Sequence, residues 1–453
     1  MMPLSLRQVR DWTDGDSQHC DLRMTVKRVT IDSREAGPGV LFVALPGTRT
    51  NGHAYVDEVW RLGGTAIVQR GFSRVGGPMI RVDSPLAAMG QLLSRYIADR
   101  QITVVGVTGS VGKTSVKELS AAVLRTRYVT TSSLGNYNTV IGLPLSFFSG
   151  DPATTHFVAE MGMRGPGEIL ELTRIAPPDV VVISTIGPSH LELMGSMQAI
   201  QRAKGEILQG LKSSGLAVLN RDNPWVRELG EATVKRVAWF GTGGDDDARI
   251  LSAEVHAEYT EVRLAVERRP MTVRLPWLGA HNAANVAAAV LVGRELGISP
   301  EEAAHGISQV DKGRSRIRVV TLDGITVLED VYNSSPLSAK AALDVLATRP
   351  GRRVAVIGDM LELGAAEATG HREVGEHAQG RADLLLAVGA RARSTFDAAQ
   401  SARVPVEWVE TREQAVDWLQ TNLRSGDTVL LKASRGLEFE RITDSLSQRG
   451  APR

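Results

Sequence analysis

The chain has 453 residues, 43% of them hydrophobic, and its 52 Lys and Arg nearly balance its 51 Asp and Glu, leaving a formal net charge of +1. This length suggests about three domains of ~150 residues each, and the near-neutral charge argues against partners such as nucleic acid or an anionic membrane surface. The single cysteine excludes an intrachain disulfide and fits a reducing compartment. Residues 1–11 lack a signal peptide's apolar run, and no stretch reaches the ~20 apolar residues of a membrane helix. We therefore expect a cytoplasmic enzyme that is not inserted in a membrane.

Residues 1–84 are expected to form a small α/β domain. Its strands are predicted at 27–31, 40–45, 65–68 and 79–82, with a helix at 54–62. Polar loops follow the first two strands, at Asp32-Ser33-Arg34 and at 47–53, which ends in Asn51-Gly52-His53. Ligands bind at such strand ends in α/β folds. Ser33 and Arg34 could grip a diphosphate, although a turn with a solvated arginine is the simpler interpretation.

The second unit, residues 85–313, is predicted to be a parallel sheet wrapped by helices. A helix is expected at 86–97, and another, rich in alanine, at 282–296. Strands are predicted at 103–107, 156–161, 180–186, 216–219 and 236–240, with helical patterns between them. Residues 250–275 instead alternate apolar and polar side chains, with a turn at 268–270, which indicates a small antiparallel meander.

The third unit, residues 314–453, restarts the alternation of strands and helices. Its strands are predicted at 325–328, 353–357, 384–388, 404–409 and 428–431. This pattern is typical of a small, doubly wound, Rossmann-like domain. The chain is therefore assigned to the α/β class, with three domains.

A glycine-rich turn follows the buried strand of the second unit. It reads Thr108-Gly109-Ser110-Val111-Gly112-Lys113-Thr114 and leads into a helix that ends near residue 124. Glycines at such a turn let backbone N–H groups converge on phosphate oxygens, and the helix N-terminus and the lysine add positive charge. The threonine hydroxyl is the usual magnesium ligand. Val107 stands where the strict pattern has glycine, yet the arrangement still predicts a nucleotide-binding loop.

Two polar residues follow neighbouring strands of the same unit. Glu160 ends the strand at 156–161, and His190 lies in the loop after the strand at 180–186. Taken singly, Glu160 is as readily a solvated strand-end residue, and a lone histidine such as His190 is more often structural than catalytic. Because parallel strands end at one edge of a sheet, we expect Thr114, Glu160 and His190 to lie close together, which favours a metal site.

Lys204 falls on the apolar stripe of a helix predicted at 196–211, four residues after Ile200 and four before Leu208. Desolvation there would lower its pKa and make the neutral amine accessible. The alternative is a lysine that snorkels from the edge of the stripe, and the residues alone leave both open.

Other polar residues flank the join between the second and third units. Asn282 and Asn285 share one face of the alanine-rich helix, where they could contact a nucleotide or simply cap the helix. Arg314 lies at the join itself, where a hinge arginine acts on phosphate only when domains close. Asp330, Tyr332 and Asn333 end the first strand of the third unit.

Together, these motifs resemble the ATP-dependent Mur ligases of peptidoglycan assembly over the whole chain. The resemblance rests on the glycine-rich turn, Glu160, Ser189-His190-Leu191-Glu192, Ala203-Lys204, His281-Asn282-x-x-Asn285 and Gly313-Arg314. Within the family, members that add D-alanyl-D-alanine are similar at Gly358-Asp359-Met360-Leu361-Glu362-Leu363-Gly364, Asp330-x-Tyr332-Asn333 and Asn136-Tyr137-Asn138-Thr139-x-x-Gly142-x-Pro144.

The resemblance implies a reaction. ATP phosphorylates the terminal carboxylate of UDP-N-acetylmuramoyl-tripeptide, and the amine of D-alanyl-D-alanine then displaces phosphate from the acyl phosphate. Phosphorylation supplies the leaving group that a carboxylate lacks. Two anions must also be brought together, which requires cations such as Lys113 and magnesium.

The resemblance also implies roles. Thr114 and Glu160 hold one Mg²⁺, and Glu160, His190 and a carbamate on Lys204 hold a second, so that a costly buried cation becomes an anion beside a metal. Lys113, Glu160, His190 and Lys204 would form the catalytic set. The remaining implied contacts are Asn282, Asn285, Arg314 and Asp330 for the nucleotide, Ser33, Arg34, Asn51, Gly52 and His53 for the UDP portion, Asn138 for the muramoyl-peptide, and Tyr332 and Asn333 for the dipeptide.

Departures from the family pattern and competing interpretations remain. Asn51, Val331 and the run 334–336 differ from the usual residues, and the last two departures leave the dipeptide contacts of the third domain open. The nearest alternatives are the tripeptide-forming Mur ligase and a folylpolyglutamate synthase. The first domain argues against the folate enzyme, because that enzyme would have no use for a UDP-binding module. A P-loop GTPase switch should carry an Asn-Lys-x-Asp-type guanine motif, which is not found. We expect a monomer.

Overall fold

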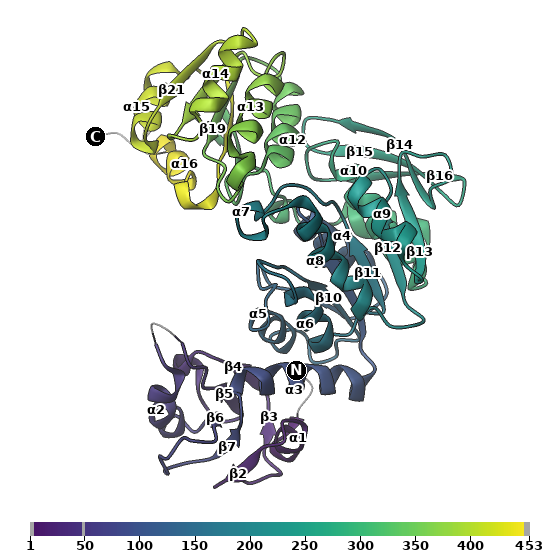
Figure 1. Ribbon diagram of the computed structural model, residues 1–453, viewed down its shortest axis with the longest axis vertical. Helices are drawn as coiled ribbons and strands as arrows, with labels where there is room; N and C mark the ends of the chain where they lie inside the picture. Colours follow the sequence, from purple (N-terminus) through teal and green to yellow (C-terminus); the bar gives the residue numbers. More distant parts are fainter. Residues whose placement is uncertain (1–3, 48–49, 448–453) are drawn as a thin grey trace.

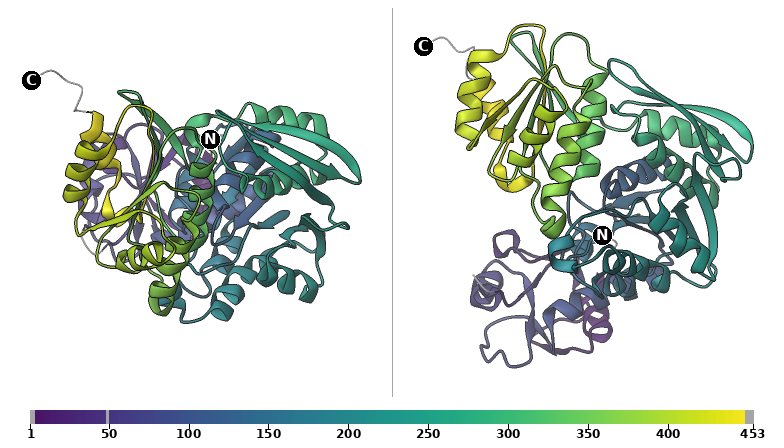
Figure 2. Two further views of the ribbon diagram at one scale, coloured as in Figure 1. Left: turned by 90° about the horizontal axis from the view of Figure 1, so that it is seen from above. Right: turned by 45° about the horizontal axis from the view of Figure 1, so that its top comes forward.

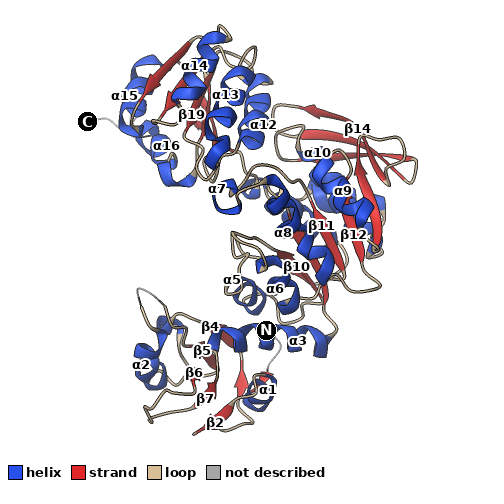
Figure 3. Cartoon of the chain, viewed as in Figure 1, coloured by secondary structure: helices blue, strands red, loops and turns tan. Residues whose placement is uncertain are grey.

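The computed structural model describes residues 4–47 and 50–447, which form three lobes in chain order (Figure 1). Each lobe is built on its own sheet, of five, nine and six strands, and the first also carries a two-stranded pair. Helices flank the sheets, as Figure 3 shows. The predicted α/β class is confirmed. The domain boundaries after residues 84 and 313 stay predictions, and they fall between these sheets.

The N-terminal lobe contains the four predicted strands and three that the sequence did not reveal. Its sheet has the order β2 (Asp16–Gln18), β7 (Met79–Val82), β6 (Thr65–Gln69), β5 (Val40–Val43) and β4 (Arg28–Thr30), beside the pair β1 (Leu4–Ser5) and β3 (Thr25–Val26). The unpredicted helix α1 (Leu6–Trp12) begins at a capping box on Ser5. The predicted helix at 54–62 is divided into η2 (Gly52–Tyr55) and α2 (Val56–Arg61).

The central lobe contains the predicted parallel sheet. Its parallel strands have the order β13 (Arg236–Gly241), β12 (Leu216–Asn220), β11 (Val180–Ile183), β8 (Thr103–Thr108), β10 (His156–Glu160) and β9 (Thr130–Ser132), of which β9 was too short and polar to predict. Helix α3 (Pro85–Arg100) leads into β8, and its buried side chains belong to one core that spans the first two lobes. The phosphate-loop strand β8 therefore lies in the middle of a supported sheet.

The helices of the central lobe follow the predicted alternation. They are α4 (Lys113–Leu124), α5 (Gly142–Phe148), α6 (Glu168–Ile175), α7 (Leu191–Met194), α8 (Met197–Gly210), α9 (Pro224–Ala232), α10 (Asn282–Glu295) and α11 (Pro300–Ser308).

The antiparallel meander extends the central sheet, away from the N-terminal lobe (Figure 2). It comprises β14 (Ala248–Val255), β15 (Thr260–Val266) and β16 (Arg269–Leu275), and β14 pairs in parallel with β13. The turn predicted at 268–270 is wrong by about two residues. Glu267 and Arg268 have φ of 49° and 66° and form it, and Pro270 lies in β16, an edge strand that needs no N–H from it.

The C-terminal lobe is the predicted doubly wound fold. Its order is β17 (Arg318–Leu322), β18 (Ile325–Asp330), β22 (Thr428–Lys432), β19 (Arg353–Gly358), β20 (Leu384–Val388) and β21 (Val406–Val409), with helices α12 (Pro336–Ala347), α13 (Glu367–His377), α14 (Arg393–Ser401), α15 (Arg412–Asn422) and α16 (Glu440–Ser447). The expectation that β18 comes first is wrong, because β17 precedes it in a hairpin turned by Asp323-Gly324. Among the described residues, no helix is long and apolar enough to cross a membrane.

Candidate active site

The glycine-rich turn connects β8 to α4 at the middle of the central sheet. Gly109 and Gly112 have φ of 152° and 87°. A Cβ on Gly109 would lie 2.1 Å from Ser184 Oγ, and one on Gly112 would lie 2.8 Å from Asn285 Oδ1. Both positions therefore require glycine, for conformation and for space.

The neighbouring strand end holds this turn in place. Ser110 Oγ donates to the Gly187 carbonyl at 2.8 Å and accepts from the Gly187 N–H at 3.0 Å, and Ser184 Oγ donates to the Val111 carbonyl at 2.6 Å. Lys113 Nζ donates to the Gly109 carbonyl at 2.7 Å. Burial lowers the pKa of Lys113, which the nearby Glu160 carboxylate opposes. The turn is thus preformed, with its lysine folded against it.

Glu160 lies beside this turn at the carboxyl end of β10, with 2% of its surface exposed. Its Oε2 accepts from Thr114 Oγ1 at 2.9 Å, and its Oε1 accepts from Asn138 Nδ2 at 3.0 Å. A fully buried lysine that the sequence analysis missed, Lys117, has Nζ 4.0 Å from Glu160 Oε2 and 2.9 Å from Glu118 Oε1. Thr114 and Glu160 therefore lie together, as predicted, and Asn138 and Lys117 lie beside them.

Lys204, on α8, contacts the same turn. It is 2% exposed, so it does not snorkel, and its Nζ donates to the Gly109 carbonyl at 3.0 Å. No carboxylate of the described chain pairs with it. Burial, reinforced by the charge of Lys113, lowers the pKa of Lys204 well below its usual value. The neutral form of the Lys204 amine is therefore populated far more than in an exposed lysine.

His190 completes this group at the loop before α7. Its backbone has φ of 52°, and its Nδ1 lies 2.5 Å from Glu362 Oε2 of the C-terminal lobe. Burial lowers the pKa of His190, and the charges of Lys113 and Lys204 lower it further, against the effect of Glu362. His190, Lys113 and Lys204 are therefore near enough to influence one another electrostatically.

Of the two asparagines of α10, Asn285 lies against the same turn and Asn282 lies behind it. Asn282 Nδ2 donates to the Leu278 carbonyl at 3.0 Å, and Asn285 Nδ2 donates to Asn282 Oδ1 at 3.1 Å. Both are buried, and Asn285 Oδ1 is the atom that leaves no room for a Cβ at Gly112. They form a short chain of amides that ends at the phosphate loop.

Two arginines of the segment between the lobes contact side chains of α4. Arg314 Nη1 lies 2.6 Å from Glu118 Oε2. Arg316, which the sequence analysis missed, donates to Thr114 Oγ1, and its guanidinium lies 4.1 Å above the Tyr332 ring. The signal was present, since Arg314 and Arg316 alternate along one segment and Thr114 and Glu118 are four apart on one helix face.

The C-terminal lobe positions the other predicted residues near this contact. Lys432 is 1% exposed, lies 3.0 Å from Asp330 Oδ2 and donates to the Asn333 carbonyl. The guanidinium of Arg435, also missed from the sequence, lies 5.5 Å from the Tyr332 ring centre. Tyr332 thus lies between the strand end that carries Asp330 and the segment that reaches the phosphate loop.

The predicted UDP-binding residues form a separate group in the N-terminal lobe. They lie after the parallel strands β4 and β5, but Arg34 is already engaged, with Nη2 2.5 Å from Asp32 Oδ2. Hydrogen bonds from Arg34 lower the pKa of Asp32 to about 2. Asn51 accepts from the His53 N–H at 3.1 Å, and Gly52 leaves no room for a Cβ beside Leu45 N. Thr48 and Arg49 of this loop lie outside the described residues.

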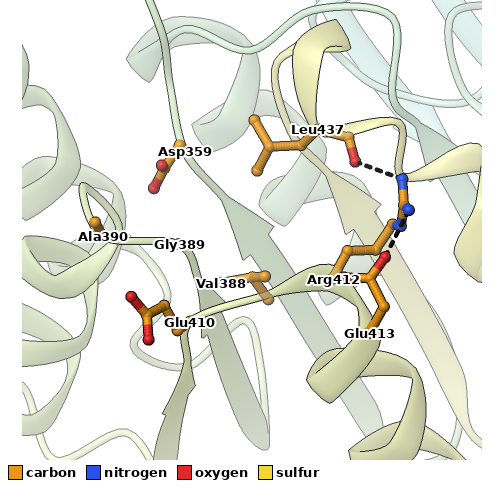
Figure 4. A pocket seen from close by; sticks show the side chains of 8 residues that line it. All are labelled: Asp359, Val388, Gly389, Ala390, Glu410, Arg412, Glu413 and Leu437. Carbon is orange, nitrogen blue, oxygen red and sulfur yellow. Dashed lines mark hydrogen bonds and ion pairs between the residues drawn. The ribbon is translucent and has the colours of Figure 1, made fainter.

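A further hollow lies at the carboxyl ends of β19, β20 and β21 in the C-terminal lobe (Figure 4). Arg412 lies along one side of it, with Nη2 2.6 Å from Glu413 Oε1. None of the predicted site residues lines it, and they are all found elsewhere.

The donors near the phosphate loop fit magnesium if Lys204 is modified. Among residues 4–47 and 50–447, no three His, Cys, Asp or Glu side chains are placed to hold a metal ion. Glu160 and His190 are two such donors, and Thr114 adds a hydroxyl oxygen. A carbamate on Lys204 would add carboxylate oxygens, giving the oxygen-rich set that Mg²⁺ prefers.

Comparisons with known proteins agree with this geometry. Residues 107–293 match the Mur ligase middle domain, and residues 313–435 match the domain described as "Mur ligase, glutamate ligase domain". The UDP-N-acetylmuramoyl-tripeptide–D-alanyl-D-alanine ligase of Bacillus subtilis is 33% identical, over 98% of this chain and 99% of its own.

Solved structures are similar throughout their length. A crystal structure of MurF from Acinetobacter baumannii has a TM-score of 0.90 and 29% identity, covering 99% of both chains. The MurF ligase of Thermotoga maritima in complex with ADP has a TM-score of 0.82 and 28% identity, covering 93% of this chain and 97% of that one. The chain therefore belongs to the Mur ligase family.

Proposed function

We propose that this chain is an ATP-dependent amide ligase that joins D-alanyl-D-alanine to the terminal carboxylate of UDP-N-acetylmuramoyl-tripeptide, releasing ADP and phosphate. Full-length similarity to ligases of that name supports the substrates. The tripeptide-forming alternative is not favoured. The reaction in the cytoplasm, by a monomer, stays a prediction.

The observation that carries the proposal is the contact of Lys204 with the phosphate loop. A buried amine without a carboxylate partner is costly to retain unless its site uses it. Carbon dioxide converts a neutral amine into a carbamate anion. That anion would lie among Glu160, His190 and Lys113, beside the place where the triphosphate ends.

The residues of the phosphate loop would perform the binding. N–H groups of residues 109–114 and Lys113 Nζ would hold the triphosphate, for which Lys113 must leave the Gly109 carbonyl. Asn282 and Asn285 would fix the nucleotide side of the loop, and Arg314 and Asp330 would complete it when the lobes close. Glu160 would hold magnesium, which neutralises the charge that the two anions share.

The substrate would extend from this edge toward both outer lobes. Ser33, Arg34, Asn51, Gly52 and His53 would receive the UDP portion, and Arg34 would exchange Asp32 for a phosphate. Asn138, held on Glu160, would orient the carboxylate that becomes phosphorylated. Tyr332 and Asn333, with Arg435 nearby, would receive the dipeptide.

Phosphate release from ATP tests the proposal. We expect turnover when UDP-N-acetylmuramoyl-tripeptide is offered with D-alanyl-D-alanine, and none when D-alanine or glutamate replaces the dipeptide. Tripeptide labelled with ¹⁸O in its terminal carboxylate should transfer one labelled oxygen to phosphate, because the acyl phosphate loses that oxygen. Robust activity with a single amino acid would instead assign the chain to a sibling ligase.

A further inference from the structure

A loop of the C-terminal lobe rests on the turn that carries His190. This loop follows β19 and ends at η4 (Gly364–Ala366). The Glu362 carbonyl accepts from the Glu192 N–H at 3.3 Å, and a Cβ on Gly364 would lie 3.0 Å from Glu192 Cα. Figure 1 places α7, which follows His190, between the central and C-terminal lobes. The two loops therefore meet backbone to backbone.

The side chains at this contact are His190 and Glu362. Both residues have left-handed backbones, with φ of 52° and 64°, which non-glycine residues adopt at a cost unless the surroundings demand it. Glu362 Oε2 lies 2.5 Å from His190 Nδ1. This ring nitrogen is buried and makes no hydrogen bond within the described chain, while the Glu362 carboxylate lies close enough to accept its proton.

We propose that Glu362 is a positioning residue that orients His190 for the second metal across the boundary between two lobes. A metal-bound histidine usually donates its other ring N–H to a carboxylate, which fixes the ring and makes it a better ligand. Because Nδ1 faces the Glu362 carboxylate, Nε2 is the nitrogen left for a metal. The inference rests on the metal role proposed for His190.

The placement of Glu362 couples the metal site to the position of the C-terminal lobe. Glu160, Thr114 and Lys204 all belong to the central lobe, whereas the carboxylate that orients His190 does not. The second metal site is therefore complete only when the C-terminal lobe is seated. The same lobe carries Tyr332 and Asn333, proposed above for the dipeptide. Closure over the acceptor would thus also order the metal ligand.

The test compares Glu362→Ala, Glu362→Gln and the matched control Glu367→Gln, a carboxylate of the same lobe that pairs with Arg391. Binding of Mn²⁺ is followed by electron paramagnetic resonance with ADP and UDP-N-acetylmuramoyl-tripeptide present. We expect Glu362→Ala to lower the Mn²⁺ affinity of the second site, at His190, by ~10-fold or more, the usual effect of losing a carboxylate that orients a metal-bound histidine. Glu362→Gln should stay within ~3-fold, because its amide oxygen can still accept the ring N–H. The control should bind as the wild type does.

Combining Glu362→Ala with His190→Ala separates positioning from other effects. If Glu362 acts through His190, adding Glu362→Ala to His190→Ala should not weaken Mn²⁺ binding any further. Wild-type Mn²⁺ affinity in Glu362→Ala would overturn the inference. So would equal losses in both Glu362 variants, which would make the carboxylate a direct ligand. These results are independent of the proposed function, which wild-type turnover with the dipeptide tests alone.

Discussion

Lys204 of the central lobe and His371 of the C-terminal lobe are both buried ionisable groups, yet their surroundings differ. His371 lies in α13 with 0% exposure, its Nε2 accepts from the Met360 N–H at 3.1 Å, and its Nδ1 lies 2.9 Å from Thr395 Oγ1. Lys204 is 2% exposed and has one carbonyl, with Lys113 near enough to repel it. Burial lowers the pKa of both.

This difference separates a structural residue from a functional one. The neutral ring of His371 has a partner at each nitrogen, so its burial stabilises the fold. The charged ammonium of Lys204 could donate three hydrogen bonds, but among the described residues it has one acceptor, which does not offset the cost of removing its charge from water. An ionisable group that the fold buries without satisfying is a candidate for chemistry.

The largest effect is expected for Lys204→Ala. Turnover should fall by ~10²–10³-fold, the scale of losing a group that stabilises charge in the transition state, while thermal unfolding shows an intact fold. Bicarbonate should not restore activity, whereas a short-chain carboxylic acid could occupy the vacated space and restore part of it. Phosphate release measures the rates. Wild-type rates in this variant would remove Lys204 from the mechanism.

His371→Ala should have the opposite profile. Removing the ring leaves a cavity and two unpaired polar groups, so the free energy of unfolding should fall by about 3 kcal/mol. The kcat of the remaining folded protein should be unchanged. Urea denaturation gives the stability, with His377→Ala, at a more exposed histidine of the same helix, as control, expected to change it by less than about 1 kcal/mol. A loss of kcat without a loss of stability would contradict this assignment.

Acid should destabilise the C-terminal lobe through the same histidine. Burial lowers the pKa of His371 from 6.5 to about 4, so the unfolded chain binds the proton more tightly. The contribution of neutral His371 to the free energy of unfolding is therefore complete above pH 6.5 and is lost as the pH falls through about 4. The total loss is about 3 kcal/mol. Urea titrations between these pH values should show a shallower decline in His371→Gln. Equal slopes in the two proteins would contradict the prediction.

The smallest effect is expected for Arg34→Ala, at an exposed arginine that already has a partner. Surface ion pairs contribute little, so thermal unfolding should not change measurably. If Arg34 exchanges Asp32 for the diphosphate, KM for the UDP substrate should rise by ~10-fold or less while kcat is retained. The matched control is Arg23→Ala, since Arg23 is an exposed arginine that pairs with Asp21 in the same lobe. Equal KM values in both variants would exclude a UDP role for Arg34.

The sequence predicted the long, regular parts of the fold and missed the short ones. Buried runs such as Thr103–Thr108 and Leu384–Val388 are apolar enough to identify as strands. Thr130–Ser132 is polar, and Arg318–Leu322 pairs only at the edge of its sheet, so neither stands out from a loop. The Asp323-Gly324 turn was the signal for the second of them.

The candidate site was predictable where a motif or a strand end placed it. The phosphate loop, Glu160 and Lys204 follow from spacing along one chain segment each. Arg316, Lys117 and Glu362 were missed, because their importance depends on contacts with residues 202, 43 and 172 positions away, such as Arg316 with Thr114 and Glu362 with His190. Apart from the alternation of Arg314 and Arg316 described above, no local pattern reports such contacts.

Modification of Lys204 is tested most directly by ¹³C nuclear magnetic resonance of the whole protein equilibrated with ¹³C-bicarbonate and Mg²⁺. We predict a protein-bound carbamate resonance in the active wild type that is absent from Lys204→Ala. An active wild type without that resonance would contradict the carbamate, and with it the reason proposed for the burial of this amine.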